Sequence, residues 1–213
     1  MIKKKPKKKP AKSAAKQTVA RARAKSAAAT VKARSAPAAK AEAKSQPKPK
    51  AKATTRQAAP LVEGAQAPDF HLQRDGGKTV SLADFAGEKL VIYFYPRADT
   101  PGCTREAIDF SRLAGDFAGH GTKVIGVSAD AVKAQDAFRD KYKLGVPLVS
   151  DETKGMIKAY GAWGEKSMYG RTFEGILRTT VLIGGDGLVL RVWRNVRVDG
   201  HAEDVLAAAQ AAA

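Results

Sequence analysis

The chain has 213 residues, and its 38 Lys and Arg residues outnumber its 21 Asp and Glu residues, for a formal net charge of +17. The single cysteine excludes an internal disulfide framework, and no apolar run approaches the ~20 residues needed to cross a bilayer. Residues 1–60 hold 19 basic residues and one acid, whereas residues 61–213 hold 19 basic and 20 acidic ones. The sequence therefore predicts a basic N-terminal segment (1–60) followed by one near-neutral domain (61–213) long enough for a sizeable core.

Residues 1–60 have the composition of a chain that does not fold by itself. They consist mainly of Lys, Ala, Pro, Arg, Ser, Thr and Gln, and they include no aromatic residue. The few branched apolar residues (Ile2, Val19 and Val31) follow no period. Because such a segment buries too little apolar surface to offset its ordering entropy, we expect it to be disordered.

The run KKKPKKKPAK and the Lys/Ala/Pro-rich sequence after it resemble the tails of linker histones and of some bacterial histone-like proteins. A flexible cation of this size would bind nucleic acid through phosphates, by counterion release and without reading bases. Three alternatives stay open: a solvated tail, a localisation signal and contact with an anionic membrane. No apolar run follows the first lysines, so we expect no secretory signal. The protein is expected in the cytoplasm, with the nucleoid as a candidate site of association, or in the nucleus of a eukaryote.

Beyond residue 60 the pattern alternates between strands and helices. Strands are expected at 69–73, 78–82, 89–95, 123–129 and 146–151, and two more within 179–194. Helices are expected at 103–119, 132–142, 154–161 and from about 202 onward. The first two strands read as a hairpin with an Asp-Gly-Gly turn, and 89–95 as a central strand buried on both faces. This order predicts an α/β fold with a mixed central sheet and helices on both faces.

The only cysteine, Cys103, stands where a helix is expected to begin after a buried strand. Thr100 suits the N-cap and Pro101 the first helical position, which would place Cys103 in the first turn. Unpaired backbone N–H groups at a helix N-terminus favour the thiolate, which is the nucleophilic form of cysteine. The alternative is a small buried hydrophobe, the commonest role of a lone cysteine.

The segment YPRADTPGCTREA resembles the active-site segment of the peroxiredoxins, specifically of the Q type (bacterioferritin-comigratory proteins). The family signature Pro-x-x-x-Thr-x-x-Cys is here Pro96, Thr100 and Cys103. The likeness continues through GAQAPDF (Gly64–Phe70), GVSAD (Gly126–Asp130) and GILRTTVLIGGDG (Gly175–Gly187). In the family an arginine just before the late strand points at the sulfur, and Arg178 holds that position. The resemblance implies a thioredoxin-like fold and a thiol peroxidase, and we expect no cofactor and no metal.

The resemblance also implies a role for each motif residue. The thiolate of Cys103 would attack the terminal oxygen of a peroxide and become a sulfenic acid. Arg178 would favour the thiolate and stabilise negative charge developing on oxygen. Thr100 would hold the peroxide in line with the sulfur, and Pro96 would shield the thiolate from water. A Thr100 side chain that faces the pocket cannot also cap the helix, so these two expectations conflict.

Many Q-type members place a resolving cysteine five residues after the peroxidatic one, and here that position is Ile108. No second cysteine exists, so no intramolecular disulfide can form. The resemblance therefore implies a one-cysteine cycle in which an external thiol reduces the sulfenic acid. Thioredoxin, glutathione and glutaredoxin all stay open as that reductant.

Other residues carry weaker signals. The three histidines show no metal-ligand spacing and are expected to be exposed or structural. Glu106 would orient an arginine or be a solvated helix charge, and Arg97 and Arg105 are expected at the surface. Trp163, Tyr169, Phe173 and Trp193 would either pack in the core or line a substrate pocket near Arg178. A different class of function also stays open: a DNA- or chromatin-associated protein whose thioredoxin-like domain is an inert interaction module.

Overall fold

The computed structural model describes residues 61–168 and 171–212. The segment 1–60, for which disorder and nucleic-acid binding are predicted, and Tyr169 lie outside the described residues. None of the described helices is long and apolar enough to cross a membrane.

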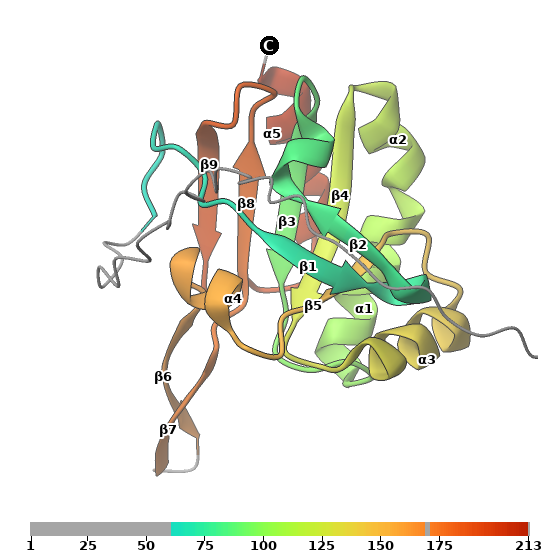
Figure 1. The fold of residues 1–213 in the computed structure, drawn as a ribbon, viewed down its shortest axis with the longest axis vertical. Helices are drawn as coiled ribbons and strands as arrows, with labels where there is room; N and C mark the ends of the chain where they lie inside the picture. The colour runs from blue at the N-terminus through green and yellow to red at the C-terminus, as the bar shows by residue number, and fades with distance from the viewer. Residues whose placement is uncertain (1–60, 169–170, 213) are drawn as a thin grey trace, which may run out of the picture. The chain divides into compact units, whose positions relative to one another are not determined.

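A seven-stranded sheet forms the centre of the domain, in the order β2-β1-β5-β4-β3-β8-β9 (Figure 1). Its strands are β1 (His71–Arg74), β2 (Lys78–Ser81), β3 (Lys89–Phe94), β4 (Thr122–Ser128), β5 (Leu148–Ser150), β8 (Thr179–Ile183) and β9 (Val189–Arg194). β3 and β5 both run parallel to β4, and the other neighbouring pairs are antiparallel. The predicted mixed sheet is confirmed.

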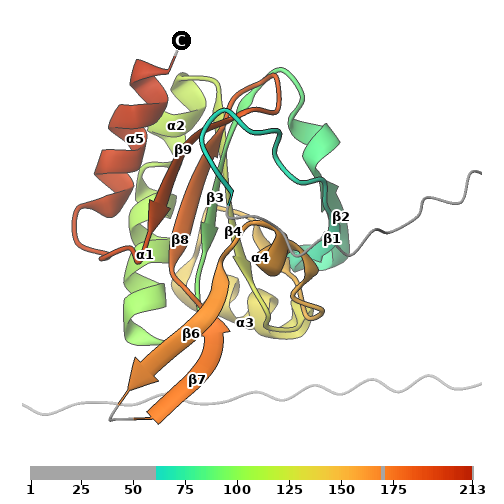
Figure 2. The ribbon, with the colours of Figure 1, turned by 90° about the vertical axis from the view of Figure 1, so that its left-hand side faces the viewer.

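Helices cover both faces of this sheet, as Figure 2 shows. α1 (Pro101–Arg112), α2 (Ala114–Gly119) and α5 (His201–Ala211) lie on one face, and α3 (Val132–Tyr142) packs beside β5. The short helix α4 (Gly155–Ala159) lies on the other face. A short 3-10 helix, η1 (Asp75–Gly77), connects β1 to β2, and a second, η2 (Leu82–Phe85), follows β2. This is the α/β, thioredoxin-like architecture predicted from the sequence.

The central strand β3 shows why the sheet is buried on both sides. Leu90, Ile92 and Phe94 belong to the apolar cluster on the α4 face. Val91 and Tyr93 alternate with them and belong to the cluster under α1 and α5. Since successive side chains of a strand point to opposite faces, a continuous apolar run is needed for a strand with helices on both sides.

The observed elements differ from the prediction in two places. The expected helix 103–119 is two helices, because Leu113 leaves the helical region at ψ 2° between α1 and α2. Leu113 and its neighbours Phe110 and Phe117 are all buried in the same cluster, so the break keeps all three against the sheet. The sequence analysis also missed a hairpin, β6 (Trp163–Met168) and β7 (Arg171–Ile176), which pair antiparallel.

The β6–β7 hairpin projects from the body of the domain at the end where β8 begins (Figures 1 and 2). It forms a separate two-stranded sheet and not part of the seven-stranded one. A strand outside the core needs no long apolar run, and the sequence WGEKSM with RTFEGI has none. This is why the pattern of apolar residues gave no strand signal there.

Candidate active site

Cys103 is the third residue of α1, which starts directly after the loop that follows β3. The side chain is only 2% exposed and belongs to the core cluster under α1. The first backbone bond of the helix runs from the Thr104 N–H to the Thr100 carbonyl, at 2.8 Å. The N–H groups of Gly102 and Cys103 precede this first donor, so they have no acceptor within the helix and give this end of α1 its partial positive charge.

Thr100 occupies the N-cap position of α1, but its side chain caps nothing. Its hydroxyl donates instead to the carbonyl oxygen of Arg97, at 3.0 Å. The expected side-chain cap was wrong, because the hydroxyl is directed back into the loop and its oxygen accepts from no N–H group of the helix. The oxygen keeps its lone pairs as hydrogen-bond acceptors. Pro96 stands directly after Tyr95, the last buried residue of the strand run, and is itself exposed.

Two aspartates that the sequence analysis did not select hold the β3–α1 loop in place. The backbone N–H of Ala98 donates to Oδ2 of Asp130, at 2.7 Å. Asp99 adopts a left-handed φ of 57°, and its carboxylate accepts from Nζ of Lys141 at 2.7 Å and from the hydroxyl of Tyr142 at 2.6 Å. Asp130 belongs to the GVSAD segment, so a sequence signal for it existed. Asp99 carried none, because its partners lie on α3.

Arg178 reaches Cys103 through the pairing of β8 with β3. Thr179, the first residue of β8, pairs with Phe94, the last residue of β3. Antiparallel pairing therefore brings the residue before β8 to the end of β3, where α1 starts. Nη2 of Arg178 lies 3.2 Å from Sγ of Cys103. The two residues are 75 positions apart in the chain.

Glu106 completes a buried group of three side chains, since its Oε2 accepts from Nη1 of the same arginine. Its side chain is 1% exposed, and Oε1 has no hydrogen-bond partner among the described residues. Burial raises the pKa of Glu106 to about 7, although the charge of Arg178 acts in the opposite direction. Of the two roles considered for Glu106, contact with Arg178 is the one observed, and the solvated-charge alternative was wrong. The carboxylate and the sulfur hold the two ends of one guanidinium.

Among the described residues, the remaining candidates form no hydrogen bond with the Cys103 sulfur. Arg97 and Arg105 are exposed, and Arg105 pairs with Asp199 at 2.6 Å. His201 is buried and its Nε2 lies 2.8 Å from Oγ1 of Thr180, which makes it structural. Among residues 61–168 and 171–212, no group of three or more His, Cys, Asp or Glu side chains could hold a metal ion.

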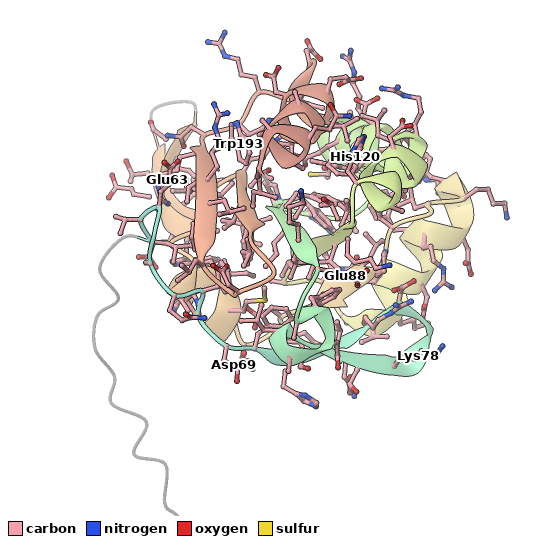
Figure 3. All side chains as sticks on the ribbon, turned by 90° about the horizontal axis from the view of Figure 1, so that it is seen from above. Glu63, Asp69, Lys78, Glu88, His120 and Trp193 are labelled. Carbon is pink, nitrogen blue, oxygen red and sulfur yellow. The ribbon has the colours of Figure 1, made fainter. Side chains whose placement is uncertain are left out.

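Of the three described aromatic candidates, two pack against the body of the domain and one lines a pocket near Arg178. Trp193, labelled in Figure 3, packs edge-on against His201 of α5. Trp163 is half-buried against the core cluster under α4, with Nζ of Lys154 4.9 Å from its ring centroid. Phe173 is 43% exposed and lines a pocket beside Arg178. Only Phe173 of the described three lines that pocket.

The fold and this site together define a thioredoxin-like protein with a buried thiol held by an arginine at a helix N-terminus. Comparisons with known proteins agree with this class. The family model described as AhpC/TSA family matches residues 64–192. Peroxiredoxin Bcp of Xanthomonas campestris is 46% identical over 143 residues, which are 67% of this chain and 89% of that protein. Peroxiredoxin Bcp of Bacillus subtilis is 38% identical over 143 residues, 67% of this chain and 91% of that one.

Solved structures give the same result. The bacterioferritin comigratory protein of Xanthomonas campestris, studied for its alkyl peroxide reduction activity, superposes with a TM-score of 0.66 at 44% identity and covers 71% of this chain and 96% of its own. A cysteine-to-serine mutant of PrxQ from Xylella fastidiosa gives a TM-score of 0.69 at 36% identity, covering 72% and 98%. The chain belongs to the AhpC/TSA family, with peroxiredoxin Q (Bcp) proteins as its relatives, and it is a thiol peroxidase.

Proposed function

We propose that Cys103 reduces hydrogen peroxide and organic hydroperoxides in a one-cysteine cycle. The thiolate Sγ attacks the terminal peroxide oxygen, so that an S–O bond forms while the O–O bond breaks. The leaving oxygen takes a proton and departs as water or an alcohol, and Cys103 becomes a sulfenic acid. An external thiol then attacks that sulfur, releases water and forms a mixed disulfide, which a second thiol reduces back to the Cys103 thiol.

The observation that carries this proposal is the contact of 3.2 Å between Nη2 of Arg178 and Sγ of Cys103. A guanidinium at this distance stabilises the thiolate and the negative charge that develops on the leaving oxygen. The free lone pairs of the Thr100 hydroxyl are suited to accept the hydrogen of the peroxide O–H and to align it with the sulfur. Pro96 would limit water at the thiolate from the outer side of the loop. Glu106 would act on the reaction through Arg178, as a positioning residue.

The single cysteine supports the external reductant. The position five residues after Cys103 is Ile108, which is 42% exposed on α1. No thiol of the same chain can therefore resolve the sulfenic acid. Thioredoxin, glutathione and glutaredoxin are the candidate reductants.

The experiment that tests this activity is the reaction of the reduced protein with limiting hydrogen peroxide, followed by intact mass. We expect a fast gain of one oxygen atom that thiol reductants reverse and that Cys103→Ser abolishes. A thiol that reacts no faster than free cysteine would contradict the proposal and favour the rival function, an inert domain carried by a nucleic-acid-binding tail.

We further propose that residues 1–60 bind nucleic acid through phosphate contacts. The support is their composition, 19 basic residues against one acid, and the lack of any aromatic residue for base stacking. Binding to duplex DNA should be independent of base sequence and should weaken steeply as salt rises. Deleting residues 1–60 should abolish binding but spare peroxide turnover. A truncated domain that still bound duplex DNA at physiological salt would contradict this division.

A further inference from the structure

Gln135 of α3 is a polar side chain that the fold buries completely, at 0% exposure. Its Nε2 donates to Oγ of Ser128 at 2.8 Å and to the carbonyl oxygen of Val149 at 3.2 Å. Its Oε1 accepts from the hydroxyl of Tyr95. Burial raises the pKa of Tyr95, so this hydroxyl keeps the proton that it donates. One amide thus joins the end of the β3 run to β4 and β5, and it cannot rotate without leaving buried groups unpaired.

A chain of hydrogen bonds continues from this amide to the loop before Cys103. The Ser128 hydroxyl donates to Oδ2 of Asp130 at 2.8 Å, and the backbone N–H of Ala98 donates to the same oxygen at 2.7 Å. A hydroxyl has one proton to donate, and that of Ser128 is used on the carboxylate. The Ser128 oxygen is therefore free to accept, and Gln135 supplies the donor. The amide on α3 in this way holds the carboxylate that holds the loop.

The two sides of the amide reach the motif loop before and after Pro96. Tyr95 directly precedes this proline, and Ala98 stands two positions after it. The carbonyl oxygen of Arg97, between the two held positions, accepts from the hydroxyl of Thr100 at 3.0 Å. The amide therefore fixes the stretch of backbone that sets the direction of the Thr100 hydroxyl.

We propose that Gln135 is a positioning residue for the reaction with peroxide, acting on the loop through Ser128 and Asp130. This inference rests on the proposed peroxidase function. The sulfur is held separately by Arg178, which shares no hydrogen bond with this network among the described residues. Loss of Gln135 slows the attack on the O–O bond, for which Thr100 aligns the peroxide. It spares reactions of the thiolate that need no such alignment.

The test compares two reactions of the same thiol on the reduced full-length chain. The first is the oxidation of Cys103 by hydrogen peroxide, and the second is its alkylation by iodoacetamide, both followed by intact mass. Both reactions require the thiolate, but alkylation requires no alignment of an O–O bond. A variant that disturbs only the loop should therefore lower the first rate constant and not the second.

Gln135→Met keeps the length of the side chain and removes both of its hydrogen-bonding sides. We expect the rate constant of oxidation to fall about tenfold, because a small misplacement of aligning groups is costly, while alkylation is not slowed. Ser128→Ala and Tyr95→Phe each remove one side and should each lower the oxidation rate about threefold. The double variant Gln135→Met/Ser128→Ala should be no slower than Gln135→Met, because both residues act in one chain of bonds.

Two control variants separate positioning from a general loss of stability. Ile183→Ala creates a cavity in β8, where Ile183 is 1% exposed and pairs with Leu90 at the start of β3, far along the sheet from the motif loop. It should lower the free energy of unfolding and leave both rate constants unchanged. Asp136→Asn alters the neighbouring residue of α3, whose carboxylate accepts from the backbone N–H of Gly76. It should also keep both rates.

Three results would overturn the inference. A wild-type oxidation rate in Gln135→Met, or in both Ser128→Ala and Tyr95→Phe if Gln135→Met does not fold, means that the network does not position the loop. An equal fall of oxidation and alkylation means that Gln135 acts on the thiolate itself or on the fold. A multiplied loss in the double variant means that the two residues act independently. Failure of the proposed function is distinguishable, since wild-type Cys103 would then be alkylated but not oxidised.

Discussion

The two segments that meet at the Cys103 sulfur are built by different means. The β3–α1 junction is local: Thr100 bonds to Arg97 and the helix starts at the next residue. Arg178 arrives from 75 positions away and is placed by the pairing of β8 with β3. In the proposed mechanism, the local segment supplies the nucleophile and the distant one supplies the charge that activates it. Changes in the two segments should therefore affect the protein differently.

Removal of the distant charge should have the largest effect. Arg178→Ala removes the donor to the sulfur, and we expect the rate constant of Cys103 oxidation by hydrogen peroxide to fall roughly 10²–10³-fold. The rate constant of Arg178→Lys should lie between those of the wild type and Arg178→Ala, because an ammonium group cannot hold both Sγ and the Glu106 carboxylate as the forked guanidinium does. Stopped-flow oxidation with mass analysis measures both. Arg105→Ala, at an exposed ion pair, is the control, and a rate for Arg178→Ala equal to that of this control would refute the role.

Low pH should destabilise the folded domain through His201, whose side chain is hydrogen-bonded to that of Thr180 in β8, the strand that follows Arg178. Burial lowers the pKa of His201 from 6.5 to about 4, although Asp204 acts in the opposite direction. Because the folded state binds the proton less tightly, this contribution to stability is present above pH 6.5 and is lost as the pH falls toward 4. The loss amounts to ~3 kcal/mol of the free energy of unfolding.

Denaturant unfolding between pH 4 and 7 measures that loss. His201→Gln keeps a hydrogen-bonding side chain beside Thr180 but does not titrate, so its stability should depend less on pH than that of the wild type. His71→Gln, at an exposed position of β1, should behave like the wild type. Parallel curves for the wild type and His201→Gln would show that His201 does not determine the acid sensitivity.

The link between the two segments is Glu106, and its loss should cost about tenfold in the oxidation rate through misplacement of Arg178. The pKa of Glu106 is raised to about 7, so the carboxylate becomes protonated below that pH and its ion pair weakens. Glu106→Gln resembles the protonated form at every pH. The two rates should converge below pH 7 and separate above it. Asp116→Asn, at an exposed position of α2 whose charge does not shift the pKa of Glu106, is the control. A rate ratio independent of pH would argue against this role.

The smallest effect is expected in the local loop. Asp99→Asn removes the charge that pairs with Lys141 but tolerates the left-handed φ of 57°. Because this ion pair is exposed, the oxidation rate should change less than about fivefold. Asp99→Ala should lower the rate more than Asp99→Asn, since alanine also resists that backbone conformation. Equal rates for the two variants would show that the conformation of residue 99 does not control the loop.

Much of the site could be predicted because its first half is contiguous. The strand before Cys103, the helix after it and the motif residues Pro96 and Thr100 all follow from a short stretch of sequence. The expected cap by Thr100 failed, since the sequence does not fix the direction of its side chain, which donates to the Arg97 carbonyl and accepts from no helix N–H. Asp99 was missed because its partners, Lys141 and Tyr142, lie on another helix.

The sequence by itself determined the alternation of strands and helices, the basic composition of residues 1–60 and the position of Cys103 at the start of a helix. These depend on the spacing of apolar residues and on turn chemistry, which act over a few positions. Only the tertiary structure showed the Cys103 sulfur and the Glu106 carboxylate at the two ends of the Arg178 guanidinium. It also brought Lys166 of the unpredicted hairpin to a pocket that Arg178 lines. Those distances depend on which strands pair and in which register, and pairing is decided by the packing of the whole domain.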